Sequence, residues 1–413
     1  SESDYVVLQG DNLSIDALAC LSGTLVSGGI FFLLIKDKAQ IENSLFYQRF
    51  FKLLTEFSDH TVLEQEQFLL PALSKRVSDK VSTDNAKKTN KAHAYHCVTQ
   101  EQVMAVDAVI KVLKGKRNKP LVLTADRGRG KSSALAIACV ELLKKASNEN
   151  QLKIVITSAD LNSLSVFFNQ MIRYCPDGEL QKATFKTEYG SVEFVAVDQL
   201  IKEPINASLL LVDEAAAIPV YLLAQLLGHY SRLVFSTTIH GYEGAGRGFT
   251  LKFQEILAAK YPKWQKLQLK EPIRWEINDP LEQFVFDACL LNAELPDLNI
   301  NLDKSDLSLL KFKRIAAEQL ASNEELFKQI FAVLVTAHYQ TKPSDVQMLL
   351  DNEQVQLVCL YCEKSNKPQI VAVALLILEG SIKGNIVNAK DIKAISQAKR
   401  RLKNHFVHCW KYL

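Results

Sequence analysis

Short apolar runs alternate with longer amphipathic stretches along this chain, and their order predicts the elements. Residues 1–75 read as strand (4–8), helix (16–28), strand (ending at 35) and helix (43–56). The apolar run that ends at residue 35 is continuous, which suits a buried strand of a sheet covered on both faces. Residues 76–98 are polar and rich in lysine, a composition typical of a linker.

A regular alternation of helix and strand begins at Thr99 and predicts a doubly wound parallel sheet. The expected helices span residues 101–114, 131–146 and 163–174, and the expected strands span 121–125, 154–158, 194–197, 209–213 and 233–237. After Trp275 the pattern predicts helices at 281–292, 306–338 and 344–351, then strands at 355–361 and 370–378 around a turn at 364–367. No internal repeat is visible.

Composition narrows the class of protein. The chain has 413 residues, of which 48% are hydrophobic, with only 16 glycines and 11 prolines, which excludes collagen-like and disordered proteins. Its apolar runs are far shorter than the roughly 20 residues of a membrane helix. Eight cysteines without a signal segment predict reduced thiols, a cytoplasmic location and no membrane partner. The net charge of +3 neither predicts nor excludes nucleic acid.

The strongest motif is Leu-Val-Leu-Thr-Ala-Asp-Arg-Gly-Arg-Gly-Lys-Ser-Ser, residues 121–133. A strand enters a glycine-rich loop that opens a helix, so backbone N–H groups and the helix dipole point at a phosphate. In this interpretation Lys131 reaches the β- and γ-phosphates and Ser132 binds Mg²⁺. The usual template has glycine at the position of Ala125, which is the one departure.

A second motif, Leu-Leu-Leu-Val-Asp-Glu-Ala-Ala-Ala-Ile-Pro, ends an apolar strand in two carboxylates. Ligands bind at the carboxyl edge of open parallel sheets, so both side chains are expected at the nucleotide. Asp213 suits a contact with Mg²⁺, and Glu214 suits orienting or deprotonating a water molecule. Together with the phosphate loop, this strand is interpreted as a Walker B strand.

Other residues carry weaker signals. The strand at 233–237 ends in the hydroxyls of Ser236, Thr237 and Thr238, as in helicase motif III, and a glycine-spaced loop with Arg247 follows. Gln102 opens a helix where an amide could contact adenine, and Arg274 could stabilise charge on a γ-phosphate. Basic and aromatic residues near the C-terminus could bind RNA, although a solvated helix is favoured there: Lys399, Arg400, Arg401, Lys403, His405, Phe406, His408 and Trp410.

Together these motifs resemble the bacterial tRNA(Met) cytidine acetyltransferases and their eukaryotic RNA-modifying relatives. The resemblance also rests on Ser-Thr-Thr-Ile-His-Gly-Tyr-Glu-Gly-Ala-Gly-Arg-Gly-Phe, Pro-Ile-Arg-Trp, Leu-Ser-Gly-Thr-Leu near residue 22 and Ala-His-Tyr-Gln-Thr-Lys-Pro at 337–343. It implies an α/β fold with a P-loop, RecA/helicase-like parallel-sheet domain. The expected parts are a partial N-terminal α/β domain (1–75), a linker (76–98), the ATPase (99–280), a helical connection (281–314) and an incomplete GNAT-like α+β domain (315–413).

The resemblance also implies an activity and its residues. The family acetylates N4 of the wobble cytidine of elongator tRNA(Met), using acetyl-CoA and the hydrolysis of ATP or GTP. Lys131, Asp213, Glu214 and Arg274 would serve that hydrolysis, with Ser132 and Asp213 at the metal. The nucleotide would be held by Arg274, Gln102, Gly128, Arg129, Gly130, Lys131, Ser132, Ser133, Ala134, Leu135, Ala136 and Ile137.

One part of the family pattern is missing from the sequence. No Arg/Gln-x-x-Gly-x-Gly/Ala turn for the pyrophosphate of acetyl-CoA follows Val346, and Gly380 and Gly384 are isolated. We therefore expect mainly ATPase function from this chain, no acetyl transfer by it alone, and a partner segment encoded separately. The alternatives are an ATP-dependent RNA-binding or remodelling module without transferase activity, and an inactive truncated relic.

Overall fold

The computed structural model describes residues 2–10, 13–35, 42–57, 59–63, 93–146, 151–239, 246–295, 310–337, 342–362 and 369–377. It divides into two compact units. The first contains residues 1–8, 20–33 and 57–283, and the second contains residues 9–19, 34–56 and 284–413. Residues 1–75 are thus shared between both units, and the predicted domain boundaries stay predictions.

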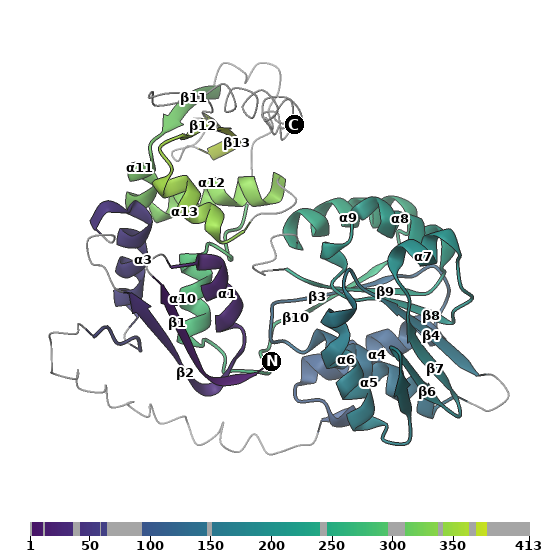
Figure 1. The fold of residues 1–413 in the computed structure, drawn as a ribbon. Coiled ribbons are helices and arrows are strands. Elements are labelled where there is room, and N and C mark those ends of the chain that lie inside the picture. Colours follow the sequence, from purple (N-terminus) through teal and green to yellow (C-terminus); the bar gives the residue numbers. More distant parts are fainter. Residues whose placement is uncertain are drawn as a thin grey trace, which may run out of the picture. The chain divides into compact units, whose positions relative to one another are not determined.

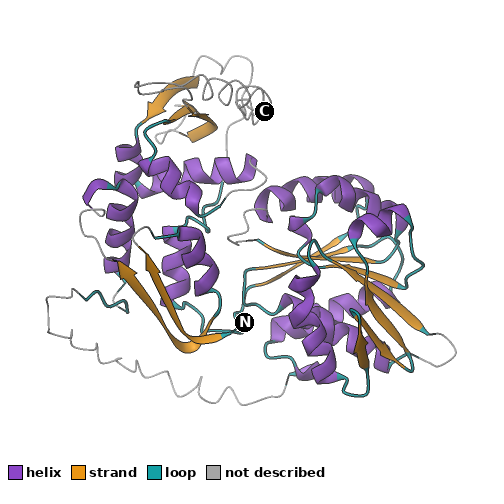
Figure 2. Cartoon of the chain, in the orientation of Figure 1, coloured by secondary structure: helices purple, strands orange, loops and turns teal. Residues whose placement is uncertain are grey.

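The first unit is built on an eight-stranded sheet (Figures 1 and 2). Six neighbouring strands run parallel in the order β10, β3, β9, β8, β4 and β7, and β6 and β5 extend this sheet antiparallel. The strands are β3 (Leu121–Ala125), β4 (Leu152–Thr157), β5 (Glu179–Gln181), β6 (Thr184–Thr187), β7 (Gly190–Phe194), β8 (Leu209–Val212), β9 (Leu233–Thr238) and β10 (Gln265–Leu269). The predicted doubly wound sheet is confirmed.

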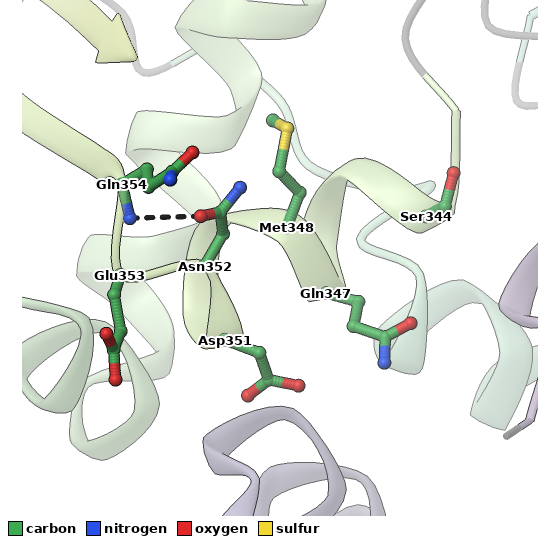
Figure 3. Close-up of a pocket in the computed structure, with 7 residues that line it drawn as sticks. All are labelled: Ser344, Gln347, Met348, Asp351, Asn352, Glu353 and Gln354. Carbon is green, nitrogen blue, oxygen red and sulfur yellow. Dashed lines mark hydrogen bonds between the residues drawn. The ribbon is translucent and has the colours of Figure 1, made fainter. Parts of the chain in front are cut away.

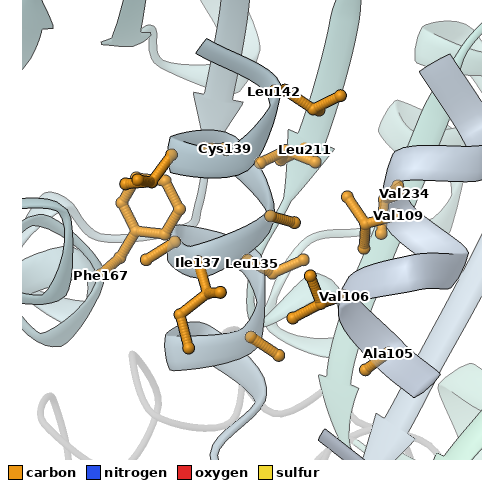
Figure 4. Close-up of a cluster of buried hydrophobic side chains, with 14 of the residues drawn as sticks. Ala105, Val106, Val109, Leu135, Ile137, Cys139, Leu142, Phe167, Leu211 and Val234 are labelled. Atoms are coloured by element: carbon orange, nitrogen blue, oxygen red, sulfur yellow. The ribbon is translucent and has the colours of Figure 1, made fainter. Parts of the chain in front are cut away.

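Helices cover both faces of this sheet (Figure 1). One face carries α4 (Gln100–Lys114), α5 (Lys131–Lys144) and α6 (Ser165–Tyr174), and the other carries α7 (Val197–Lys202), α8 (Val220–His229) and α9 (Gly246–Lys260). Successive strand residues point to opposite faces, so Leu121 and Leu123 pack with the first helices while Val122 packs with the second. Figure 4 shows the first cluster, in which α5 lies between Phe167 of α6 and Val106 of α4.

The second unit combines helices with a small antiparallel sheet. Its sheet has the order β11 (Leu310–Ile315), β12 (Val355–Cys362) and β13 (Gln369–Ile377), and its helices are α3 (Leu45–Glu56), α11 (Ala317–Ser322), α12 (Glu324–Ala337) and α13 (Ser344–Asp351). Four elements cross the division between the units: β1 (Ser3–Gly10), α1 (Ile15–Ser22), β2 (Leu25–Ile35) and α10 (Pro280–Ala288).

Arg49 holds the helices of the second unit together. Its guanidinium pairs with Glu324 and also donates to the carbonyls of Asp287 (2.7 Å) and Ala288 (2.9 Å). The ring of Phe327 lies under it at 5.3 Å. A buried arginine is tolerated where its donors are satisfied in this way.

Three expected elements are wrong. The helix predicted at 16–28 ends at Ser22, because a turn closes from Thr24 to Leu21, and residues 25–35 form a strand. That strand is not covered on both faces: it pairs in a two-stranded sheet, and its side chains alternate, with Phe32 45% exposed. The strand predicted at 194–197 lies instead at Gly190–Phe194, and α7 starts at Val197.

The helix predicted at 306–338 is also wrong in its first half. Residues 310–315 form β11, paired antiparallel with β12, so the expected helical connection at 281–314 contains part of a strand. The sequence Leu-Lys-Phe-Lys-Arg-Ile alternates apolar and basic residues, which is the two-residue period of a strand. The linker at 76–92, the turn at 364–367 and the C-terminal basic residues lie outside the described residues.

We expect the buried side chains of β8, which lies inside the eight-stranded sheet, to contribute strongly to the free energy of unfolding of the first unit. Leu211 of β8 is fully buried, so Leu211→Ala should lower the free energy of unfolding by about 2–5 kcal/mol through lost contacts and a residual cavity. Leu161→Ala, at a side chain 42% exposed, is the matched control. Urea unfolding measures both, and equal losses would contradict this account of the core.

Candidate nucleotide site

The phosphate loop takes its shape from two glycines. The chain leaves β3, turns through residues 126–130 and enters α5 at Lys131. Gly128 has φ +77° and Gly130 has φ +74°, a left-handed conformation that glycine adopts without strain. Gly130 is also the N-cap of α5, so the N–H groups of the first helical turn face the loop.

The Ser132 and Asp213 side chains meet at the carboxyl edge of the sheet. Ser132 Oγ donates to Asp213 Oδ2 at 2.7 Å, and Asp213 is only 1% exposed. Burial raises the pKa of Asp213, and the neighbouring Glu214 carboxylate raises it further, while the Ser132 hydroxyl and the Lys131 ammonium lower it. The two oxygens are hard ligands of the kind that Mg²⁺ takes from a protein alongside water and phosphate.

Lys131 is 7% exposed and donates to Thr238 Oγ1 at 2.8 Å. The same hydroxyl donates to Glu214 Oε2 at 3.2 Å, and Lys131 Nζ lies 3.8 Å from Glu214 Oε1. Thr238, at the end of β9, therefore bridges the phosphate-loop lysine and the candidate general base. The sequence singled out this hydroxyl but gave it no place in the site, although a strand that neighbours β8 and ends in threonine carried the signal.

Glu214 turns sharply out of β8. Its φ of 47° and ψ of 48° are left-handed, a conformation that costs a non-glycine residue on the order of 1 kcal/mol or more. Its N–H donates to Asp213 Oδ1 at 3.1 Å. This backbone turn brings the carboxylates of consecutive residues to the same edge, which a regular strand would point to opposite faces.

Residues 273–275 lie against the phosphate loop. Ile273 N–H donates to the Gly128 carbonyl at 2.9 Å, and a Cβ added at Gly128 would lie 2.9 Å from the Trp275 ring. Gln102 also reaches the loop: it is 2% exposed, and its Nε2 lies 3.5 Å from the Gly130 carbonyl oxygen. The structure therefore brings two further predicted regions, Gln102 and the Pro-Ile-Arg-Trp segment, to the loop.

The Arg129 side chain pairs with Glu282, outside the phosphate loop. It forms a two-point ion pair with Glu282 of α10, including a 3.1 Å contact from Nη2 to Oε2, and donates to the carbonyls of Arg127 and Lys270. Its guanidinium carbon lies 6.0 Å from the Trp275 ring centroid. Only the backbone of Arg129 is placed to contribute to phosphate binding. Among other predicted residues, Ala134, Leu135, Ala136 and Ile137 are buried in α5, and the side chain of Arg247 lies outside the described residues.

The second unit has a shallow depression that is lined mainly by polar side chains. It is lined by α13 and the following turn, between residues 344 and 354 (Figure 3). Asp351 there accepts hydrogen bonds from Ser44 Oγ and the Phe46 N–H, so it caps α3.

Within the described residues no group of three or more metal-ligating side chains occurs, and no helix is long and apolar enough to cross a membrane.

Comparison with known proteins matches two family models to the chain. Residues 122–292 match the helicase domain of the RNA cytidine acetyltransferases NAT10/TcmA, and residues 329–402 match GNAT acetyltransferase 2. The resemblance to the tRNA(Met) cytidine acetyltransferase family is confirmed. The predicted fold class is confirmed with it: a P-loop helicase-like α/β domain is followed by sequence of a GNAT domain.

Similar proteins carry the name tRNA(Met) cytidine acetyltransferase TmcA. The relative from Vibrio cholerae is 37% identical over 93% of this chain and 49% of its own length, and that from Nitrosococcus halophilus is 35% identical over 92% and 52%. The chain thus spans about half the length of these relatives. Among solved structures, the large terminase of bacteriophage HK97 is similar at a TM-score of 0.33 and 11% identity, over 65% of this chain and 61% of that one.

The raised pKa of Asp213 has a consequence for stability. The folded protein binds this proton more tightly than the unfolded chain, whose Asp pKa is about 3.9, so stability is lost as the pH rises through the folded pKa. We expect Asp213→Asn to unfold at a higher temperature than wild type at neutral pH, with a difference that shrinks toward about pH 4.

Thermal unfolding across that pH range tests this expectation. Asp198→Asn, at a side chain 69% exposed, is the control and should follow wild type. A variant at Asp213 that is less stable than wild type at neutral pH would mean that the folded protein prefers the ionised carboxylate.

Proposed function

We propose that the first unit binds and hydrolyses Mg-ATP or Mg-GTP. The observation that supports this most strongly is that hydrogen bonds connect the start of α5, directly after the phosphate loop, to the two carboxylates at the end of β8. Ser132 donates to Asp213, and Thr238 accepts from Lys131 and donates to Glu214. The loop N–H groups and Lys131 would hold the phosphates, and Ser132 and Asp213 would hold Mg²⁺, which neutralises phosphate charge. Glu214 would orient or deprotonate a water molecule.

The hydrolysis is proposed to serve a tRNA cytidine acetyltransferase. The relatives named above, together with the match of residues 329–402 to a GNAT domain, support acetyl transfer from acetyl-CoA to N4 of the wobble cytidine of tRNA(Met) as the activity of the whole protein. Nucleotide-dependent RNA binding or remodelling without transfer stays the alternative, which the match of residues 122–292 to a helicase domain would also fit.

Lys131 and Glu214 should separate binding from chemistry. Lys131→Ala should weaken nucleotide binding severely, because it removes the cation that faces the phosphates, and calorimetry with ATP and a non-hydrolysable analogue measures this. Lys144→Ala, at the far end of the same helix and 47% exposed, is its control. Unchanged affinity in the Lys131 variant would remove this site from the account.

Glu214→Gln should keep its affinity for nucleotide but lose turnover by roughly 10²-fold or more, the scale of a lost general base. The exposed Glu203→Gln is the control. The phosphate released with and without tRNA(Met) is the readout for all variants. Wild-type turnover after Glu214→Gln would place the base at another residue.

A further inference from the structure

The Leu-Ser-Gly-Thr-Leu motif near residue 22 has no part in the function proposed above. In the structure it forms a hydrogen-bonded turn at the end of α1. The Thr24 N–H and Oγ1 both donate to the Leu21 carbonyl, at 2.9 and 2.7 Å. The Ser3 N–H donates to the Thr24 carbonyl at 3.0 Å, which fixes the turn against β1. Gly23, at its tip, is buried.

Gly23 contacts Arg274 through its backbone. Arg274 Nη1 donates to the Gly23 carbonyl, and Arg274 Nε lies 3.5 Å from a carboxylate oxygen of Glu2. The neighbours of Arg274, Ile273 and Trp275, are the residues that lie on the phosphate loop. A guanidinium has five N–H groups, so a carbonyl that orients it from one side leaves capacity for an anion.

Gly23 also contacts an arginine of the phosphate loop itself. A Cβ at this position would lie 2.9 Å from both Cδ and Nε of Arg127 and 3.2 Å from its Cζ. These distances are too short for a real side chain, so the lack of one at residue 23 makes room for Arg127. The backbone of Gly23 is not left-handed, so alanine is permitted there by φ and would displace only the end of a flexible side chain.

We propose that the 21–24 turn is a positioning element of the nucleotide site. Its Gly23 carbonyl orients Arg274, and the missing side chain at Gly23 sets the place of Arg127, so two guanidiniums are held beside the loop before phosphate charge develops. Pre-organised charge of this kind is the main catalytic resource in phosphoryl transfer. This inference rests on the proposed nucleotide function and deepens it, since it gives the N-terminal segment a role in hydrolysis.

The first test is a double-mutant cycle of Gly23→Ala with Arg127→Ala, in the full chain. A displacement of about 1 Å can cost up to roughly 10²-fold in rate, so we expect Gly23→Ala to lower kcat for ATP by about tenfold or more with little change in KM. In the Arg127→Ala background the same substitution has nothing to displace and should have no further effect. Gly228→Ala, at a glycine with nothing within 4 Å of its added Cβ, is the matched control.

The second arm addresses Arg274. Thr24→Val removes one of the two hydrogen bonds that close the turn on the Leu21 carbonyl and leaves the backbone one in place. It should therefore loosen the turn, lower kcat in wild type and have no effect in an Arg274→Ala background. Thermal unfolding is followed in parallel, and losses of kcat that persist in both arginine backgrounds would show a merely structural turn and overturn the inference. A silent Gly23→Ala, with Lys131→Ala still abolishing binding, overturns the inference alone. Unchanged binding in Lys131→Ala would remove the proposed function and the inference together.

Discussion

The first unit has to accommodate a carboxylate at the buried end of a parallel strand. Asp213 is almost completely removed from water, and an ionised carboxylate there is costly unless it is paired. Its partners come from the start of α5, so the strand β8 and the helix α5 must be held in one register for the pair to form. The left-handed turn at Glu214 and the Thr238 hydroxyl that bridges Lys131 and Glu214 lie at this same edge.

Packing on the two apolar faces of the sheet imposes the same constraint on register. The helices on each side bury alternate residues of the same strands, and this fixes the depth at which each strand ends. A one-residue slip of β8 would turn Asp213 away from Ser132 and place a leucine or valine in the wrong layer. Packing in the core and chemistry at the edge therefore select the same register.

Much of this unit was predictable because its signals are local. The strand, loop and helix at 121–144 and the Asp-Glu strand follow from periodicity and glycine placement, and the structure brings Gln102, Lys131, Ser132, Asp213 and Glu214 to one edge. The strand at 310–315 was missed although its alternation of apolar and basic residues is a local signal, because that alternation is only six residues long and was absorbed into the longer helical pattern that follows it. Its partner β12 begins some 45 residues later, counted from residue 310 to Val355, and a pairing over that separation is not visible in a local window. The ion pair of Arg129 with Glu282 was unpredictable for the same reason.

That ion pair limits how the protein can be dissected. The predicted ATPase domain stops at residue 280, but the carboxylate that neutralises the Arg129 guanidinium sits two residues beyond, on a helix that both units share. The Arg129 side chain is 8% exposed, and stripping a buried ion of its partner typically costs about 3–5 kcal/mol. An isolated ATPase fragment cut at that boundary would carry an uncompensated charge in its own phosphate loop, so a fragment that keeps this ion pair has to extend past Glu282.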